Sequence, residues 1–415
     1  MTVILYAIPF FFLLIALELW VDRVRGTGFY RLNDAITSLS AGVLSRVMVV
    51  AHQLIPITVY VLVFEQFAQF SLSAIWWLWL LAFIAYDFFY YWNHRLGHEM
   101  SILWAAHVVH HSSEEYNLTT ALRQTSGAIF SWIFYLPMAI AGVPPEMFIT
   151  IAALNLVYQF WVHTRHIDDL GWMEKIFVTP SNHRVHHAQN KIYIDKNYGG
   201  VFIIWDRLFN TFKHEEKDVE IIYGIRGALN SFNPVWANCQ IYAQLIKDSY
   251  HTKRWQDKLR VWFGRTGWRP TDVSQRFPLQ KTLLEHFVKF DPSQSPLTKL
   301  YCTLQHGIML TVTLYLLLAL QSINGTAQLA LVLAVLSSAV MTGFILQGMP
   351  RALKLDSIRL ISIAVLLGFM DVATWLQISI VALHCVSLII GLMVLRKVAH
   401  QINETDDLSD EPSSS

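Results

Sequence analysis

Long apolar stretches separated by polar segments run along most of this chain. They cover residues 3–20, 41–63, 74–91, 127–141, 147–162, 300–320, 329–346, 360–370 and 375–395. Most have the roughly 17–25 residues that a helix needs to cross a bilayer. The stretches 127–141 and 360–370 are shorter, so a kinked, tilted or re-entrant course is the alternative for them. The pattern predicts an all-α integral membrane protein, a helical bundle with at most nine spans.

If the chain crosses the membrane at each of these stretches, almost all lysine and arginine residues fall on one side of the membrane. With the N-terminus outside, all of them except Arg46, which lies near the cytoplasmic end of the stretch 41–63, fall in the loops 21–40, 93–126, 164–299 and 349–359 and after residue 395. The opposite loops have none: 64–73, 142–146, 321–328 and 371–374. Cytoplasmic loops carry the excess of basic residues. The loops at 93–126 and 164–299 are therefore predicted to be cytoplasmic, in the endoplasmic reticulum membrane of a eukaryote or the inner membrane of a bacterium.

The composition agrees with a membrane protein and narrows its partners. The chain is 54% hydrophobic and 15% charged, against about 25% charged residues in soluble domains. Its net charge of +1 decides nothing about a nucleic-acid partner, but no basic block alternates with aromatic residues, so no nucleic-acid partner is expected. The three cysteines form no C-x-x-C motif, so neither a disulfide framework nor a zinc ribbon is expected. Residues 3–20 lack a charged leader and a small-residue cleavage site, which favours a retained span over a signal peptide.

The pattern also divides the chain into five regions. These are N-terminal spans (1–73), a histidine-rich domain (74–215), a cytoplasmic connecting segment (216–299), C-terminal spans (300–398) and a tail (399–415). The last residues, 404–415, are acidic and rich in serine, so we expect the tail to be disordered.

Nine of the 17 histidines are concentrated in the histidine-rich domain. They form an H-x₃-H pair, two H-x₂-H-H triplets and a single residue between the triplets: His94 and His98; His107, His110 and His111; His183, His186 and His187; and His163. At the chain's histidine frequency, chance predicts about 0.03 such triplets. Each triplet presents its imidazoles on one face of a helix, since positions i, i+3 and i+4 are neighbours there.

These histidines are candidate metal ligands, because neutral imidazole is the commonest metal ligand in proteins. Nine ligands are too many for one ion, and four or five per ion predicts a cytoplasmic cap with two metals. Ligand type leaves iron, copper, zinc and nickel open. The spacing matches neither H-E-x-x-H nor the paired Glu-x-x-His of soluble di-iron bundles. A binuclear histidine site at a membrane surface fits oxygen activation on a lipid substrate.

Several polar residues are candidates to orient or assist this site. Asp87 lies on the helical face of His94 and His98, where it would accept an N–H from a ligating imidazole. Asn155 and Gln159 form a stripe with His163 at i, i+4 and i+8, which predicts interhelical hydrogen bonds or a role at the metal site.

The remaining polar residues of this domain divide into two sets. Asp195, Asn197 and Tyr198 follow the second triplet and are candidates to orient it, with isolated surface or packing roles as the alternative. Spacing alone predicts solvated charges at Glu99, Glu114 and Glu115. Spacing likewise predicts surface or core positions for the isolated histidines 52, 214, 251, 286, 306, 384 and 400, and leaves His166 ambiguous.

The histidine pattern resembles that of the fatty acid hydroxylase / sterol desaturase superfamily of membrane di-iron enzymes. The resemblance is densest from about residue 75 to 215, through Asp87–Arg95 (DFFYYWNHR), 107–124 (HVVHHSSEEYNLTTALRQ), 158–164 (YQFWVHT), 179–187 (TPSNHRVHH) and 195–199 (DKNYG). These strings are similar to the branch that oxidises ether lipids. The chain departs from the superfamily at Asn182, at Ile167, where other members have a second histidine, and at Asn210, where glycine is common.

The resemblance implies a catalytic domain at 74–215 that holds two iron ions. It implies O₂-dependent hydroxylation of the ether-linked carbon of an alkylglycerol, with tetrahydrobiopterin as cofactor, giving glycerol and a fatty aldehyde. It also places Glu99 among the functional positions, so the candidate catalytic residues are Glu99, Asp87 and Asn155. The electron donor is left open, because no sequence feature indicates a pterin site.

Two other functions remain open from the sequence. One is a sterol or fatty-acyl hydroxylase or desaturase of the same superfamily, which would share the metal site. The other is a metal transporter, whose site is expected near the bilayer midplane on broken helices. The histidine clusters instead fall at or beyond the cytoplasmic ends of the predicted spans, which disfavours transport.

Overall fold

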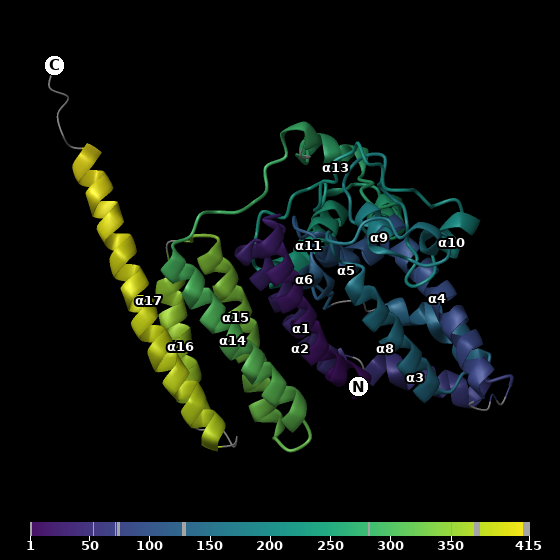
Figure 1. Ribbon diagram of the computed structural model, residues 1–415, viewed down its shortest axis with the longest axis horizontal. Helices are drawn as coiled ribbons and strands as arrows, with labels where there is room; N and C mark the ends of the chain where they lie inside the picture. Colours follow the sequence, from purple (N-terminus) through teal and green to yellow (C-terminus); the bar gives the residue numbers. More distant parts are fainter. Residues whose placement is uncertain are drawn as a thin grey trace. The chain divides into compact units, whose positions relative to one another are not determined.

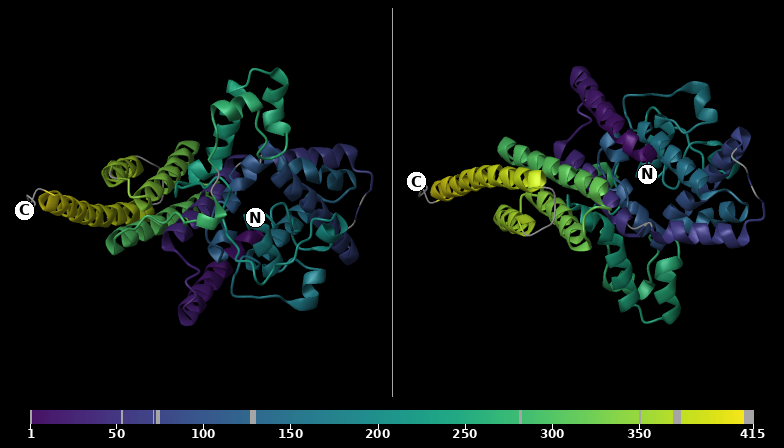
Figure 2. Two further views of the ribbon diagram at one scale, coloured as in Figure 1. Left: turned by 90° about the horizontal axis from the view of Figure 1, so that it is seen from above. Right: turned by 90° about the horizontal axis from the view of Figure 1, so that it is seen from below.

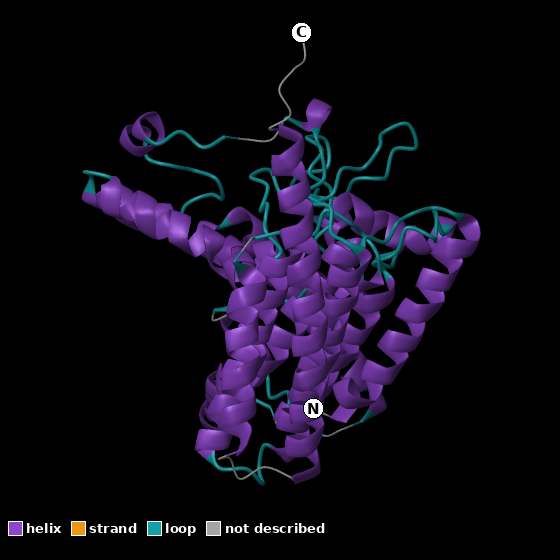
Figure 3. Cartoon of the chain, turned by 90° about the vertical axis from the view of Figure 1, so that its left-hand side faces the viewer, coloured by secondary structure: helices purple, strands orange, loops and turns teal. Residues whose placement is uncertain are grey.

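The computed structural model describes residues 2–52, 54–70, 72, 75–126, 130–280, 283–349, 351–368 and 374–409. The chain divides into two compact units. Unit 1 comprises Met1–Asn230 and Trp236–Phe290, and unit 2 comprises Ser231–Val235 and Asp291–Ser415. The described residues form helices and loops without a named strand (Figures 1 and 3), with isolated bridges at Met100–Arg265, Phe177–Phe202 and Ala188–Tyr223. The all-α prediction is therefore confirmed for the described part of the chain.

Unit 1 is built from long helices joined by short helices and loops (Figure 1). Its elements are α1 (Thr2–Arg25), α2 (Leu32–His52), α3 (Leu54–Phe67), α4 (Trp76–Glu99), α5 (Ser101–His111), α6 (Leu118–Ala121), η1 (Ser131–Tyr135), α7 (Leu136–Ile140), α8 (Pro145–Trp161), η2 (Gly171–Lys175), α9 (Pro180–His186), α10 (Ile204–Leu208), α11 (Pro234–His251, whose first two residues belong to unit 2), α12 (Trp255–Phe263), α13 (Thr271–Arg276) and η3 (Leu284–His286). The loops that follow α8 lie together at one end of α4 and α8 (Figure 1).

The central helix of unit 1 is α4, whose apolar part runs without interruption into the first histidine pair. It contains no proline and no glycine before Gly97, so the helix continues beyond the predicted span 74–91 to Glu99. One side packs into a core of aromatic and aliphatic residues with α3, α7 and α8, in which the Tyr86 and Tyr135 rings stack 4.7 Å apart. Because this core fixes α4, the position of its C-terminal histidines is fixed as well.

The described residues of the stretch 41–63, predicted as one span, are helical on both sides of residue 53. α2 ends at His52 and α3 begins at Leu54, with residue 53 outside the described residues.

The described residues of unit 2 form a bundle of four helices: α14 (Pro296–Ala319), α15 (Gly325–Leu346), α16 (Ala352–Gly368) and α17 (Thr374–Ser409). Three helices of the described chain are long and apolar enough to cross a membrane, at Pro296–Ala319, Gly325–Leu346 and Gln377–Val394. All three belong to unit 2. The helix α17 continues to Ser409, so residues 404–409 are helical where the sequence predicts disorder; residues 410–415 lie outside the described residues.

Candidate metal centre

The nine clustered histidines come from four segments of unit 1. His94 and His98 lie one turn apart near the end of α4, and α5 carries the first triplet. The second triplet occupies α9 and the residue that follows it, and His163 comes two residues after α8. The helix α9 begins with Pro180 at its first turn and with the Thr179 side chain capping it, so its start is well defined.

The structure brings all nine imidazoles together in two neighbouring groups. The first group contains His94, His98, His107, His111 and His186, and the second contains His110, His163, His183 and His187. Within each group, one nitrogen of every ring lies within 4.8 Å of the others. The groups touch, because the rings of His111 and His187 stack with centroids 4.3 Å apart. The division into five and four matches the number of ligands per ion expected from the sequence.

Backbone carbonyls fix the orientation of at least four of these rings. The carbonyl oxygens of Tyr198, Arg123, Gln159 and Lys196 lie 2.7–3.0 Å from Nδ1 of His94, His110, His163 and His186, respectively. A carbonyl can only accept, so Nδ1 of each ring must carry the proton. The Nε2 atom of a neutral ring is then a bare acceptor that points into its group.

Burial keeps the rings neutral. It lowers the pKa of His94 to about 3 and that of His110 to about 4. It also lowers the pKa of the other seven histidines well below its usual value, chiefly because a charged ring in this dry surrounding loses its hydration. At neutral pH the groups therefore present lone pairs rather than positive charges.

The convergence of these lone pairs fits a bound cation. Nε2 of His110 and Nε2 of His163 are 3.3 Å apart, and both are bare acceptors. In the first group, Nε2 of His107 lies 3.0 Å from that of His94 and 3.1 Å from that of His111. Two imidazole nitrogens that share one first-row metal ion at about 2.1 Å are themselves about 3.0–3.4 Å apart. The residues therefore fit two metal ions, one in each group.

Asp87 forms its hydrogen bonds with groups other than the imidazoles. It is completely buried and accepts hydrogen bonds from Asn155 Nδ2 (2.9 Å), the backbone N–H groups of Val201 (2.8 Å) and Phe202 (3.0 Å), and Trp205 Nε1 (3.0 Å). The predicted hydrogen bond from an imidazole to Asp87 is therefore wrong, because four other donors occupy its oxygens. Asp87 instead ties α4 to the segment whose Tyr198 carbonyl holds His94, so its influence on that ring is indirect.

The polar stripe on α8 has two roles. Asn155 bonds to Asp87, and Gln159 accepts a hydrogen bond from Tyr90 (2.7 Å), so both side chains join α8 to α4. The Gln159 carbonyl orients His163, which lies in the second histidine group. Interhelical hydrogen bonding therefore accounts for the two amides, whereas the third member of the stripe belongs to the candidate metal centre.

The three acidic residues expected to be solvated behave differently from one another. Glu99 is partly exposed and pairs with Arg95 at 3.0 Å. Glu114 and Glu115 are buried, so that expectation is wrong for them. Glu115 pairs with Arg31 and, at 2.8 Å, with Lys289, while Glu114 accepts the Phe290 N–H at 2.6 Å. Their partners lie up to 176 residues away, which short-range spacing cannot reveal.

The segment after the second triplet does orient the site, mainly through its backbone. The carbonyls of Lys196 and Tyr198 hold His186 and His94. Asp195 and Asn197 adopt φ values of 61° and 55°, a left-handed conformation that Asn and Asp tolerate better than most residues. Asn210, where the resemblance predicts glycine, has a φ of 60°, which lies in the same left-handed region.

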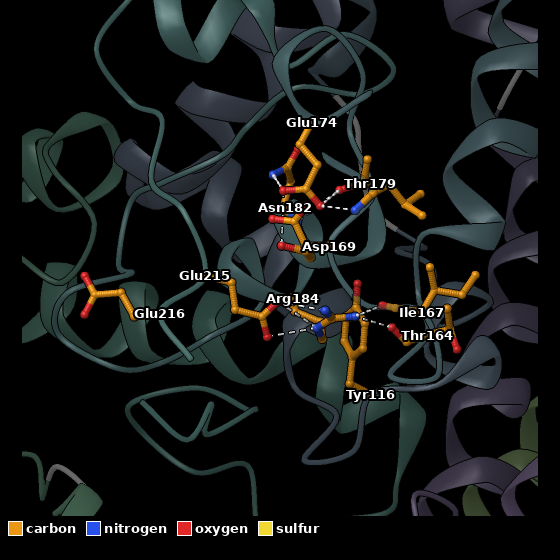
Figure 4. A network of polar contacts seen from close by, with 12 residues as sticks. Tyr116, Thr164, Ile167, Asp169, Glu174, Thr179, Asn182, Arg184, Glu215 and Glu216 are labelled. Atoms are coloured by element: carbon orange, nitrogen blue, oxygen red, sulfur yellow. Dashed lines mark hydrogen bonds and ion pairs between the residues drawn. The ribbon is translucent and has the colours of Figure 1, made fainter. Parts of the chain in front are cut away.

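The sequence did not single out Arg184 or Glu174, which hold α9 in place (Figure 4). Arg184 donates to the Thr164 and Ile167 carbonyls at 3.0 and 2.7 Å and pairs with Glu215 at 2.7 Å. Glu174 accepts from the Thr179 hydroxyl at 2.8 Å, beside the start of α9. The two side chains thus link the loop after His163 to the helix that carries the second triplet. The position of Arg184 within the 179–187 string is the signal that could have found it.

The other histidines stay outside both groups. His166 lies 4.0 Å from Asp22 and beside the Phe29 ring, which resolves its ambiguous position in the sequence against ligation. Among the described residues searched for metal-binding groups, none of the remaining isolated histidines joins either group.

The similarity of this chain to known proteins agrees with a histidine-rich metal centre. The fatty acid hydroxylase family matches residues 79–211, a range that contains all nine histidines. The chain is 38% identical over 374 residues to alkylglycerol monooxygenase from Homo sapiens, covering 88% of this chain and 82% of that protein. It is 38% identical over 377 residues to the enzyme of that name from Danio rerio (88% and 82%) and 37% identical over 358 residues to that from Xenopus tropicalis (85% and 79%). No solved structure matches the chain.

The class of protein is therefore a lipid-modifying hydroxylase with a histidine-rich centre. The chain belongs to the fatty acid hydroxylase family, within its alkylglycerol monooxygenase branch. The resemblance seen in the sequence is confirmed.

Proposed function

We propose that this protein is a membrane-bound di-iron monooxygenase that hydroxylates the ether-linked carbon of alkylglycerols. The observation that carries the proposal is the pair of converging imidazole groups in a chain 38% identical to alkylglycerol monooxygenases over most of its length. One ion would be held by His94, His98, His107, His111 and His186, and the other by His110, His163, His183 and His187. Ligand type alone does not select iron; the family relationship favours it.

The reaction would insert one oxygen atom of O₂ into a C–H bond next to the ether oxygen. Two bound iron ions would supply the oxidising chemistry for that step. The other oxygen atom leaves as water, with two electrons and two protons from a donor that we propose to be tetrahydrobiopterin. The hydroxylated carbon is a hemiacetal, which breaks its C–O bond to release glycerol and a fatty aldehyde.

The chain's own residues would prepare this step by orientation and by exclusion of water. Backbone carbonyls keep the ring nitrogens pointed into their groups, and burial of the rings keeps them neutral and able to bind metal. We propose Asp87 and Asn155 as positioning residues, since they hold the segment that contains Tyr198. Glu99 lies one residue beyond His98 and is the candidate acid–base group at the site's partly exposed edge.

We also propose that the metal centre faces the cytoplasm, with the chain crossing the membrane up to nine times. The distribution of lysine and arginine supports this topology. The test uses sealed vesicles whose cytoplasmic face points inward. A tag inserted in the loop 321–328 should then be reached from outside by an impermeant antibody. A tag inserted at 216–220 should be protected, and the opposite result would reverse the topology.

The test of function is aldehyde release in membranes that contain the protein. Membranes are given a 1-O-alkylglycerol and O₂, with and without tetrahydrobiopterin, and His110→Ala membranes serve as the control. We expect fatty aldehyde only with the unaltered chain, and more with the pterin than without it. If the iron-loaded protein releases no aldehyde with any reductant, the ether-lipid assignment is wrong.

A second candidate is hydroxylation or desaturation of a sterol or fatty-acyl chain, which the match to the fatty acid hydroxylase family favours. It would use the same metal centre on a different carbon. Lipid mass spectrometry of an expressing host separates the two: loss of alkylglycerols supports the first, and a gain of hydroxylated or unsaturated chains supports the second.

A further inference from the structure

The short helix α12 (Trp255–Phe263) has apolar residues on two opposite faces. Its inward face includes Val261, which is buried in one cluster with Ala105 of α5 and Leu245 of α11. Its outward face carries Trp255, Leu259 and Phe263, whose exposed fractions are 80%, 67% and 61%. The helix is therefore not an ordinary surface helix, in which the outward face is polar.

The geometry of the helix separates these faces fully. At about 100° per residue, Trp255, Leu259 and Phe263 fall within about 80° of one another. Val261 falls about 200° from the middle one, so the exposed residues face almost directly away from the body of unit 1. The neighbouring helix α11 adds Tyr250 and Ile246, which are also exposed. We call the five residues Ile246, Tyr250, Trp255, Leu259 and Phe263 the outer apolar face.

Basic residues border the outer apolar face. Between residues 253 and 265 there are five basic residues and one acid, Asp257, which gives a net charge of +4: Lys253, Arg254, Lys258, Arg260 and Arg265. Asp257 is mostly buried, so the exposed border is basic. Aromatic and aliphatic side chains surrounded by lysine and arginine are typical of a helix that lies in the surface of an anionic membrane.

This face is anchored to the helices that carry the histidines. The Ser101 N–H at the start of α5 bonds to the Gly264 carbonyl at 3.0 Å, and the Thr266 N–H bonds to the Glu99 carbonyl at 3.0 Å. Figure 2 shows α11, α12 and α13 standing out sideways from the other helices of unit 1. A force on α12 is thus transmitted to the ends of α4 and α5, where His98 and the first triplet lie.

We propose that the outer apolar face is an in-plane contact with the anionic surface of a lipid bilayer. Trp255, Leu259 and Phe263 enter the head-group and upper acyl region, and the basic border pairs with lipid phosphates. A second copy of the chain is a poor occupant, since a twofold contact would set the basic border of one copy against the same border of the other. The contact holds unit 1 at a fixed depth in the leaflet.

The test measures the depth of Leu259 in the full-length protein. Leu259→Cys is made with Cys239→Ser and Cys385→Ser, because these two cysteines are exposed and Cys302 is buried. The new cysteine is labelled with an environment-sensitive fluorophore, and the protein is placed in nanodiscs of phosphatidylcholine with or without phosphatidylserine. Asp218→Cys, at an exposed polar position of unit 1, is the matched control.

We expect the label at position 259 to emit at shorter wavelength than the control label. Lipids with a quencher near the glycerol backbone should quench it at least about twofold more strongly than the control. Phosphatidylserine should increase this difference, and the added substitutions Lys253→Gln and Arg254→Gln should remove the increase.

Two results would overturn the proposal. In one, the label at 259 is as accessible to water as the label at 218 in both lipid mixtures. In the other, it is shielded from water in the nanodiscs but is not quenched by the lipid-borne quencher, which would assign the face to protein, either a second copy or another part of this chain.

Discussion

Each unit contains a buried polar cluster, and the two clusters differ in their balance of hydrogen-bond donors and acceptors. In unit 1, nine imidazoles converge with acceptors facing acceptors, as in the pair of bare nitrogens of His110 and His163. In unit 2, Arg359 donates to Asp356 (2.6 Å), Ser338 (2.6 Å) and Gln305 (2.7 Å), and Tyr301 donates to the second oxygen of Asp356. The second cluster matches donors with acceptors.

The contrast shows how to distinguish a binding site from a structural network. The network of Asp356 and Arg359 pairs its two charges with each other and joins α14, α15 and α16, although Gln305 Nε2 is buried without a hydrogen-bond partner among the described residues. An excess of buried acceptors is costly unless a cation compensates for it. The balance of donors and acceptors therefore separates the roles of the two clusters.

The largest expected effect comes from removing one candidate metal ligand from the histidine groups of unit 1. We expect His110→Ala to lower activity by on the order of 10³-fold or more, since loss of a metal position removes several kcal/mol of transition-state stabilisation. Metal analysis should find roughly one ion fewer per chain. His384→Ala, which alters a buried histidine of unit 2, is the control and should keep its metal. Equal metal content in both variants would contradict the difference between the clusters.

The next effect is on the stability of unit 2. Arg359→Met leaves Asp356 buried without its cation and should lower the free energy of unfolding by about 3–5 kcal/mol. The double substitution Asp356→Leu with Arg359→Met should recover most of that loss, because no charge is left unpaired. Unfolding of the reconstituted protein measures both, with metal content expected to be unchanged. A double variant as unstable as the single one would show that the cluster is more than a balanced network.

A smaller effect is expected for Asp87, whose oxygens are matched by donors and which supports the histidine groups indirectly. Asp87→Asn removes acceptor capacity from four donors and loosens the segment that orients His94, so activity should fall about 10–100-fold. Asp248→Asn alters another buried acid of unit 1, paired with Arg269, and serves as the control. Activity lost to the same degree in both variants would indicate general destabilisation instead of positioning.

The smallest effect concerns Glu99. Its ion pair with Arg95 is partly exposed, so Glu99→Gln should change the free energy of unfolding by about 0.5 kcal/mol or less. If Glu99 acts in proton transfer, turnover should nevertheless fall and its pH profile should change, with metal content constant. An unaltered rate and profile would leave Glu99 as a surface ion pair.

The sequence predicted the helical class and the candidate site well because both depend on local patterns. Apolar stretches and i, i+3, i+4 histidine spacing report on single helices, and all nine histidines converge as expected.

What the sequence could not predict depends on contacts across long distances. The carbonyls of Tyr198 and Lys196 have no side-chain signature, because any residue offers the same oxygen. The burial of Glu115 depends on Arg31 and Lys289, 84 and 174 residues away. Asp87 is spaced correctly for His94, yet donors from residues 201–205 reach it first.

Each H-x₂-H-H triplet is shared between the two histidine groups. On α5, His107 and His111 enter the first group and His110 the second, and on α9 His186 enters the first while His183 and the following His187 enter the second. A single inserted or deleted residue within either triplet would turn the later histidines by about 100°. Small in-frame insertions or deletions there should abolish both groups together, so a natural variant that keeps one metal position and has lost the other is expected to carry a substitution instead.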